Sequence, residues 1–140
     1  MSGFDCIFCN IEEERIVAIH DGVRPLISTT LINKLVQNTK NDSGVIPIVP
    51  VKDSIRKING ITSIRLNRSN LYKVQTPQCF ISGNIKEAYA QNFSNTFTDD
   101  ASVFESTGGN LITVFGEERN IKITTQQDFQ LAKIILNRNK

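Results

Sequence analysis

The sequence predicts a single α/β domain built on a largely parallel sheet. Short apolar runs rich in β-branched residues alternate along the chain with stretches whose apolar residues recur at helical spacing. The run Ile16 to Ile19 is too short for a free-standing helix and apolar throughout, so we expect a strand buried on both faces in the middle of the sheet. The length of 140 residues suits one core, and we treat residues 1–140 as one domain.

The composition excludes several classes of protein. Sixteen basic residues against 14 acidic ones leave a net charge of +2, which is too small to indicate a nucleic-acid or membrane-surface partner. No apolar run approaches the length needed to cross a bilayer. The three cysteines are an odd number and follow no leader segment, so we expect reduced thiols in a cytoplasmic protein.

The first 14 residues are typical of the interior of a domain, because Phe4, Ile7, Phe8 and Ile11 form a helical apolar stripe with nothing ahead of it to pack against. Cys6-Ile-Phe-Cys9 has the spacing of a zinc or redox motif. No second pair follows, and His20 is the only histidine, so we predict packing residues instead.

The elements after the first strand begin with a helix. Ser28 is the predicted cap of a helix over Thr29–Asn38. The chain then returns as a strand over Val45–Val51. Because Pro47 and Pro50 lack backbone donors, we expect this strand to lie near an edge or to leave the sheet.

A projecting β-arm is predicted over residues 51–71. Lys52–Ile58 and Ile61–Asn67 flank Asn59-Gly60, a dipeptide typical of two-residue hairpin turns. The arm is too apolar to remain exposed alone, which favours a partner subunit as its cover; the alternative is an arm folded back on its own domain. Its apolar residues are Ile55, Ile58, Ile61, Ile64 and Leu66.

The next segment contains a strand and two helices. We predict a strand over Leu71–Val74 and a helix capped by Ser82 that runs to about Asn92. Thr98 is the predicted cap of the second helix, which carries two acidic residues in its first turn and ends at Gly108-Gly109.

The chain closes with two strands and a helix. The predicted strands are Leu111–Phe115 and the brief Ile121–Ile123. Thr124 and Gln127 form a capping-box pattern that opens a helix over Gln126–Leu136.

Polar residues follow the predicted strands. The carboxyl ends of parallel strands gather at one edge of a sheet, where ligands bind. Cations and hydroxyls at that edge would suit a phosphate ester, although each residue alone is also explained as a surface charge or a helix cap. The residues concerned are Asp21, Arg24, Arg68, Thr76, Thr98, Asp99 and Lys122.

Other chemistries are poorly supported. The sequence has neither the P-loop pattern nor Gly-x-Gly-x-x-Gly, which excludes those nucleotide-binding motifs. His20 and Asp21 are adjacent and would point to opposite faces of a strand, which argues against a Ser-His-Asp triad. We interpret His20 as an orienting or packing residue rather than a base.

Five stretches resemble, in this order, the motifs of the 2-C-methyl-D-erythritol 4-phosphate cytidylyltransferase family, over a match from about Ile16 to the C-terminus. They are His20-Asp-Gly-Val-Arg-Pro25, Pro50-Val-Lys-Asp-Ser54, Gln75-Thr-Pro-Gln78, Thr98-Asp-Asp-Ala-Ser102 and Asn120-Ile-Lys-Ile-Thr124.

The resemblance implies a Rossmann-like nucleotidyltransferase sheet with a projecting hairpin arm. It also implies transfer of CMP from CTP to 2-C-methyl-D-erythritol 4-phosphate in non-mevalonate isoprenoid biosynthesis, with Mg²⁺ and release of pyrophosphate. The family forms homodimers through interlocked β-arms, which agrees with the arm predicted above. Nearest alternatives are a cytidylyltransferase for another polyol phosphate, such as ribitol 5-phosphate, and a non-catalytic dimerisation remnant.

The resemblance also implies roles for individual residues. Asp21, Arg24, Ser54, Thr76 and Thr98 resemble groups that bind the polyol phosphate. Arg68 resembles an arginine that reaches into the neighbouring subunit to hold the substrate phosphate, and Lys122 resembles the lysine near the transferring phosphate; these two are the predicted catalytic residues. Asp21, Gly22 and Lys122 are predicted to lie against the nucleotide, and no residue is predicted to ligate a metal.

The N-terminal part departs from the family pattern. Family members begin with a strand and a Gly-rich loop that holds the CTP triphosphate, and nothing of this precedes Met1. Gly3 and Cys6 stand where the family has an arginine and a serine. We therefore expect an N-terminally truncated, incomplete domain that is inactive alone.

Overall fold

The computed structural model describes residues 11–137. Cys6, Cys9, Gly3 and the apolar stripe from Phe4 to Phe8 lie outside the described residues. Within residues 11–137, no helix is both long enough and apolar enough to cross a bilayer.

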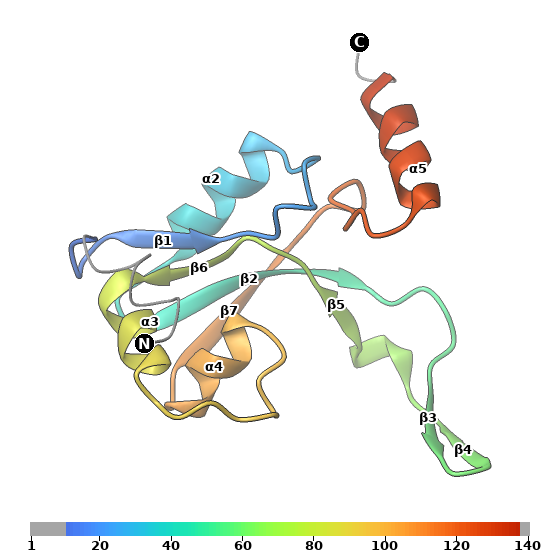
Figure 1. Cartoon of the computed structure of the whole chain (residues 1–140), viewed down its shortest axis with the longest axis horizontal. Coiled ribbons are helices and arrows are strands. Elements are labelled where there is room, and N and C mark those ends of the chain that lie inside the picture. The colour runs from blue at the N-terminus through green and yellow to red at the C-terminus, as the bar shows by residue number, and fades with distance from the viewer. Residues whose placement is uncertain (1–10, 138–140) are drawn as a thin grey trace.

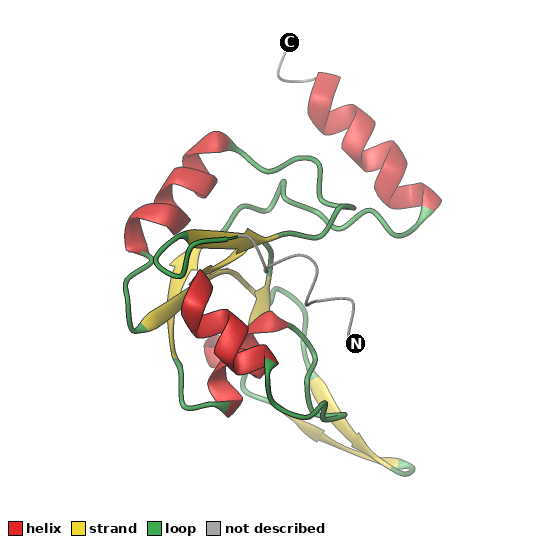
Figure 2. Ribbon diagram, turned by 60° about the vertical axis from the view of Figure 1, so that its left-hand side comes forward, coloured by secondary structure: helices red, strands yellow, loops and turns green. Residues whose placement is uncertain are grey.

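The fold is a five-stranded mixed sheet with helices on both faces, as the α/β pattern predicts (Figures 1 and 2). Its strands are β1 (Ile16–Ile19), β2 (Ser43–Pro50), β5 (Tyr72–Val74), β6 (Gln78–Ile81) and β7 (Asn110–Phe115). β1, β2 and β7 run in one direction, and β5 and β6 run in the other.

β2 lies at the centre of the sheet, so the prediction that its prolines place it near an edge is wrong. It pairs in parallel with β7 on one side, and with β6 and β5 on the other. The carbonyl of Pro47 accepts a hydrogen bond from the Gln75 amide at 2.8 Å. The absent N–H of Pro47 therefore faces the interruption between β5 and β6, where no ladder bond is lost.

β1 does not lie in the middle of a parallel sheet. It pairs antiparallel with β6, and within the described residues it has no second neighbour. Its residues alternate between exposed and partly buried, so the expected burial on both faces is also wrong. The continuous apolar run of β1 could not distinguish an antiparallel edge strand from a buried parallel one. Its partner, β6, has no distinctive sequence pattern and was not predicted.

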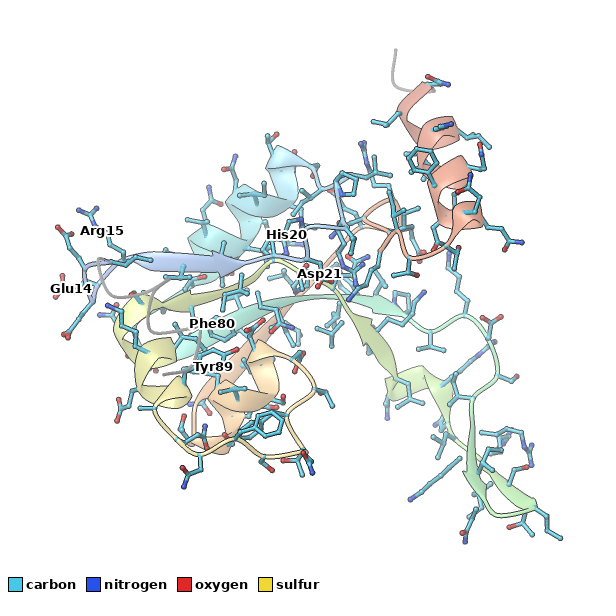
Figure 3. All side chains as sticks on the ribbon, viewed as in Figure 1. Glu14, Arg15, His20, Asp21, Phe80 and Tyr89 are labelled. Carbon is cyan, nitrogen blue, oxygen red and sulfur yellow. The ribbon has the colours of Figure 1, made fainter. Side chains whose placement is uncertain are left out.

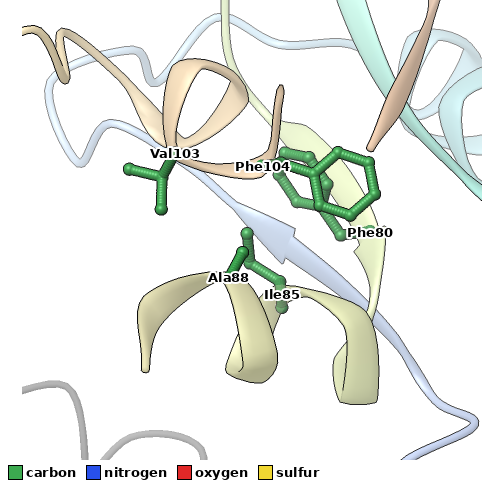
Figure 4. Packing of buried hydrophobic residues seen from close by; sticks show 5 residues of the cluster. All are labelled: Phe80, Ile85, Ala88, Val103 and Phe104. Atoms are coloured by element: carbon green, nitrogen blue, oxygen red, sulfur yellow. The ribbon is translucent and has the colours of Figure 1, made fainter. Parts of the chain in front are cut away.

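Residues of β6 alternate between the two faces of the sheet and join a core on each. Cys79 packs with helix α2 (Thr29–Asn38), through Leu31 and Leu35. Phe80 faces the helices α3 (Ser82–Tyr89) and α4 (Asp100–Ser106) and is fully buried against Phe104, with ring centroids 5.2 Å apart (Figure 4). Burying such a ring contributes about 2–3 kcal/mol.

The helix starts confirm one predicted cap and correct the others. Ser28 accepts a hydrogen bond from the Leu31 amide, as predicted. Asp99, not Thr98, caps α4 and forms a capping box with Ser102. Ser82 is the first residue of α3 and makes no capping bond, and α3 ends at Tyr89 rather than near Asn92.

The last helix, α5 (Gln126–Asn137), also starts differently from the prediction. The Thr125 hydroxyl accepts from the Asp128 amide, and the Asp128 carboxylate accepts from the amides of Thr124 and Thr125. The capping pair is therefore Thr125 and Asp128, one residue later than Thr124 and Gln127. Only Ala132 of this helix is buried, and α5 stands apart from the sheet (Figure 1).

The predicted arm is a separate two-stranded sheet that projects from the domain (Figures 1 and 2). Its strands are β3 (Arg56–Asn59) and β4 (Thr62–Arg65), with η1 (Arg68–Asn70) after them. Asn59 pairs with Thr62, so the two turn residues are Gly60 and Ile61 rather than Asn59 and Gly60. Gly60 has a φ of 60°, which suits a turn that needs positive φ at its first central residue only.

Candidate functional site

A cavity of about 710 Å³ opens beside the sheet and collects the polar residues that follow its strands. Five predicted ligand-binding residues line it: Asp21, Arg24, Thr76, Thr98 and Lys122. They come from the β1–α2 loop, the β5–β6 interruption, the turn before α4 and the segment before α5. The structure thus brings together groups separated by up to about a hundred positions in sequence.

Asp21 lies just after the end of β1 (Figure 3) and is the centre of a charged cluster. Its carboxylate accepts a hydrogen bond from Arg24 Nε at 3.0 Å and lies 3.3 Å from Lys122 Nζ. Arg24 is nearly buried, and its Nη1 donates to the Asn120 carbonyl at 2.9 Å. Lys122 is half exposed, so its ammonium group remains accessible to an anion in the cavity.

The pKa of Asp21 reflects two opposed influences. Partial burial is the largest single one and raises the pKa of the carboxyl, but the hydrogen bonds and charges of Arg24 and Lys122 together outweigh it. The net pKa therefore lies below the ordinary value of 3.8. Asp21 is ionised at neutral pH and offsets one of the two cations beside it.

The loop that carries Lys122 is held by two side chains that the sequence analysis did not single out. Buried Gln75 donates from Nε2 to the carbonyls of Glu117 (2.8 Å) and Asn120 (3.2 Å), and its Oε1 accepts from the Glu117 amide at 3.2 Å. Fully buried Asn120 donates from Nδ2 to the Thr76 carbonyl at 2.9 Å. Both residues belong to the motif stretches quoted above. Gln75 directly precedes Thr76, and Asn120 lies two positions before Lys122. This closeness in sequence was the only signal that could have identified the two amides as part of the site.

The segment from Ile121 to Ile123 is an irregular loop, so the predicted strand there is wrong. The Ile123 amide donates to the Val23 carbonyl at 2.8 Å, and this bond ties the loop to the one after β1. Isolated backbone hydrogen bonds and the side chains of Gln75 and Asn120 hold this segment in place of the hydrogen-bond ladder of a strand. A pattern of alternating apolar residues cannot distinguish such a loop from a strand.

Thr76 and His20 connect the cavity to the start of the β1–α2 loop. Thr76 Oγ1 accepts from the Asp21 amide at 2.9 Å and lies 2.9 Å from His20 Nδ1. His20 Nε2 lies 3.0 Å from the Arg24 carbonyl. Both ring nitrogens therefore have protein partners, in agreement with an orienting histidine.

The opposite wall of the cavity comes from α3 and α4. Tyr89 donates a hydrogen bond to the Asp100 carboxylate, and burial raises the pKa of both groups. Asp99 accepts from Gln78 Nε2 at 2.8 Å while it caps α4. The cations of the cavity therefore lie on the side of the β1–α2 and β7–α5 loops, and its other side is acidic and aromatic.

Three predicted residues lie away from this cavity's lining. Ser54 and Arg68 are exposed at the base of the arm, where Arg68 donates to the Lys52 carbonyl. Gly22 is in the β1–α2 loop, and a Cβ built on it meets nothing within 4 Å. The roles proposed for these three residues therefore depend on groups that bind from outside the cavity.

Comparison with known proteins identifies the family. The family model of 2-C-methyl-D-erythritol 4-phosphate cytidylyltransferase matches residues 5–138. The chain belongs to this family. The cytidylyltransferase of Azobacteroides pseudotrichonymphae is 39% identical over 131 residues, which are 91% of this chain and 58% of that protein. The cytidylyltransferase of Syntrophotalea carbinolica is 42% identical over 132 residues, or 92% of this chain and 57% of that protein.

Solved structures of cytidylyltransferases share the fold. The 4-diphosphocytidyl-2C-methyl-D-erythritol synthase of Anaerococcus prevotii superposes with a TM-score of 0.83 at 31% identity, covering 96% of this chain and 62% of that one. The cytidylyltransferase of Francisella tularensis gives a TM-score of 0.79 at 30% identity, covering 89% and 61%. These likenesses confirm the predicted nucleotidyltransferase fold class. The chain spans somewhat less than two thirds of the length of each of these relatives.

We expect the charge of Asp21 to stabilise the fold only above about pH 4, because a carboxylate with a lowered pKa loses its favourable contacts once it is protonated. At about pH 7, Asp21→Asn should lower the free energy of unfolding by about 1.5–3 kcal/mol, the contribution of hydrogen bonds to charged groups. The difference should shrink toward zero as the pH falls below about 4. Urea unfolding at several pH values measures it, with the exposed Asp42→Asn as a control; a difference that persists unchanged at low pH would contradict the assignment.

Proposed function

We propose that the cavity binds the polyol phosphate in a cytidylyl transfer from CTP to 2-C-methyl-D-erythritol 4-phosphate, the reaction for which the family is named. The observation that carries this proposal is the cluster of Arg24 and Lys122 around Asp21. Two cations against one anion leave a local positive charge for a phosphate, although the chain's net charge is only +2.

The proposed reaction needs alignment and charge neutralisation rather than a protein nucleophile. A phosphate oxygen of the polyol phosphate attacks the α-phosphorus of CTP; a new P–O bond forms, and the bond to the bridging oxygen breaks to release pyrophosphate. Two anions have to approach each other for this step. Half-exposed Lys122 and partly buried Arg24 reduce their repulsion, and fixed positions of the reacting groups remove much of the entropic cost.

Each predicted residue keeps a defined role in the proposal. Lys122 faces the transferring phosphate, Arg24 and Asp21 hold the polyol phosphate, and the hydroxyls of Thr76 and Thr98 contact it from the other cavity walls. The open space beside Gly22 supports a nucleotide position next to the β1–α2 loop, against Asp21 and Lys122.

We propose that Mg²⁺ acts with the nucleotide rather than in a site made by the protein alone. Among residues 11–137, no group of three His, Cys, Asp or Glu side chains is placed to hold a metal ion. The Asp21 carboxylate is already engaged by Arg24 and Lys122. Phosphate oxygens and water are the usual partners of Mg²⁺ in such reactions, and when bound the ion would offset the charge of the triphosphate.

The arm supports a homodimer as the working form. Ile58 pairs with Ser63, and Lys57 pairs with Ile64, so Ile58 and Ile64 lie on opposite faces of the hairpin. Both isoleucines are strongly exposed. A hairpin folded back on its own domain would cover one of these faces, whereas a second copy that clasps the arm would cover both.

In the proposed dimer, Ser54 and Arg68 belong to a binding site in the neighbouring subunit. Both are exposed at the base of the arm, and neither lines the cavity of its own chain. We propose that they complete the polyol-phosphate site of the neighbouring subunit. We also infer a cytoplasmic location, with which the buried free thiol of Cys79 agrees.

We expect the chain to bind 2-C-methyl-D-erythritol 4-phosphate, and Lys122→Ala to weaken that binding by about 10-fold because it removes a charge-assisted contact to phosphate. Isothermal titration calorimetry measures the affinities. Lys133→Ala, which removes a lysine on α5, should leave the affinity unchanged. Absence of saturable binding would contradict the proposed substrate, and tighter binding of ribitol 5-phosphate would favour that polyol instead.

We expect the double variant Ile58→Asp, Ile64→Asp to be monomeric, because a charge on each face of the arm would have to be buried in the dimer. Light scattering during size-exclusion chromatography at micromolar concentration measures the mass. Ile134→Asp, at an exposed apolar residue on α5, is the matched control and should remain dimeric. A monomeric wild-type chain under the same conditions would contradict the proposed dimer.

A further inference from the structure

We propose that His20 is a positioning residue that fixes the direction of the Thr76 hydroxyl, so that Thr76 accepts a hydrogen bond from a hydroxyl group of the ligand and does not donate one to its phosphate. This inference rests on the proposed polyol-phosphate site and names the part of the ligand that one wall recognises. It depends on three hydrogen bonds around Thr76 Oγ1 and the His20 ring.

The hydrogen bond between His20 and the Arg24 carbonyl determines which ring nitrogen carries the proton. His20 Nε2 lies 3.0 Å from the Arg24 carbonyl oxygen, which can only accept a hydrogen bond. Nε2 therefore carries a proton. In the neutral imidazole the other nitrogen, Nδ1, is then an acceptor.

The hydrogen bond between Thr76 and His20 determines the direction of the Thr76 hydroxyl proton. Its Oγ1 lies 2.9 Å from His20 Nδ1, and with Nδ1 as an acceptor the hydroxyl must donate there. The same oxygen accepts from the Asp21 amide at 2.9 Å. A hydroxyl has one proton and two lone pairs, so one lone pair is all that remains for a ligand.

The remaining lone pair of Thr76 is available to a ligand in the cavity. Thr76 is partly exposed and lines the space that Asp21, Arg24 and Lys122 share. A phosphate oxygen without a proton cannot donate to the remaining lone pair, whereas an alcohol can. Thr76 therefore favours the polyol part of a ligand, and the two cations are left to bind its phosphate.

The arrangement also explains why His20 matters without touching the ligand. If the Thr76 hydroxyl rotated away from Nδ1, it would donate into the cavity and present its proton to any anion there. Keeping that proton directed at His20 Nδ1 removes a donor that would otherwise favour free phosphate over the polyol phosphate. A carboxamide that supplies an acceptor at the position of Nδ1 should do the same.

A direct test is ¹⁵N NMR of the imidazole in the untagged chain, whose single histidine needs no assignment. In the spectrum of the neutral imidazole, the ring nitrogen coupled to both carbon-bound protons should be the protonated one, Nε2. The Nδ1–H form would overturn the inference, whatever the chain binds. The measurement needs no ligand, so it separates this inference from the proposed function.

A matched pair of variants tests the consequence for binding. His20→Asn retains an acceptor near the position of Nδ1, and His20→Gln retains a donor near the position of Nε2 but loses that acceptor. We expect His20→Gln to weaken 2-C-methyl-D-erythritol 4-phosphate binding about 3- to 10-fold, the effect of one hydrogen bond, and His20→Asn to retain most of it. Inorganic phosphate, the probe of the cations alone, should not bind more weakly to either variant.

The decisive comparison is between the effect of His20→Gln in the wild-type chain and its effect in the Thr76→Val variant, because His20 acts on the ligand only through the Thr76 hydroxyl. Once Thr76→Val has removed the hydroxyl, adding His20→Gln should weaken polyol-phosphate binding no further. Equal losses in the two His20 variants, or a full additional loss on the Thr76→Val background, would overturn the inference. If the wild-type chain binds inorganic phosphate but not the polyol phosphate, the proposed substrate fails, and the selectivity inferred for Thr76 fails with it.

Discussion

The arrangement of the site depends on the hydrogen bonds made by Gln75 and Thr76, where the strand formed by β5 and β6 is interrupted. The Gln75 carboxamide holds the loop after β7 at Glu117 and Asn120. The Thr76 hydroxyl holds the loop after β1 at the Asp21 amide. Two consecutive residues thus fix the two loops that carry Asp21, Arg24 and Lys122.

This clamp is anchored in the centre of the sheet and requires close packing. The Gln75 amide donates to Pro47 of β2, so the interruption is attached to the most buried strand. A Cβ on Gly116 would lie 2.4 Å from Gln75 Oε1, so a larger residue there would have to displace the carboxamide that holds the loop. Asn120 closes the arrangement, because its carbonyl accepts from both Gln75 and Arg24. The charges of the site are positioned by neutral amides that are themselves buried.

Local signals predicted much of the fold. The helix over Thr29–Asn38, its Ser28 cap and the projecting hairpin follow from sequence, because they depend on neighbouring residues. The strand predictions that failed depend on tertiary pairing. β6 has too few residues for a periodic signal, and the environment of β1 depends on β6. Asp99 rather than Thr98 caps α4 through a local capping box with Ser102, and Gln78, distant in sequence, also donates to the Asp99 carboxylate.

The site was predictable to a similar extent. Strand ends and motif resemblance selected Asp21, Arg24, Thr76, Thr98 and Lys122, and these residues do share a cavity. Gln75, Asn120 and the Tyr89–Asp100 pair were missed, since an uncharged amide or a buried phenol has no sequence pattern that distinguishes a structural clamp from a surface residue.

The most direct test of the clamp is hydrogen exchange in Gln75→Ala. The amides of Glu117, Asn120 and Ile123 should exchange at least about 10-fold faster than in the wild-type chain, because the loss of the carboxamide bonds frees the loop locally. The β2–β7 ladder should keep its protection, and Gln91→Ala, which removes another hydrogen-bonded glutamine, should leave this loop unchanged. Unchanged exchange in the loop, or an equal loss of protection throughout the sheet, would contradict the account.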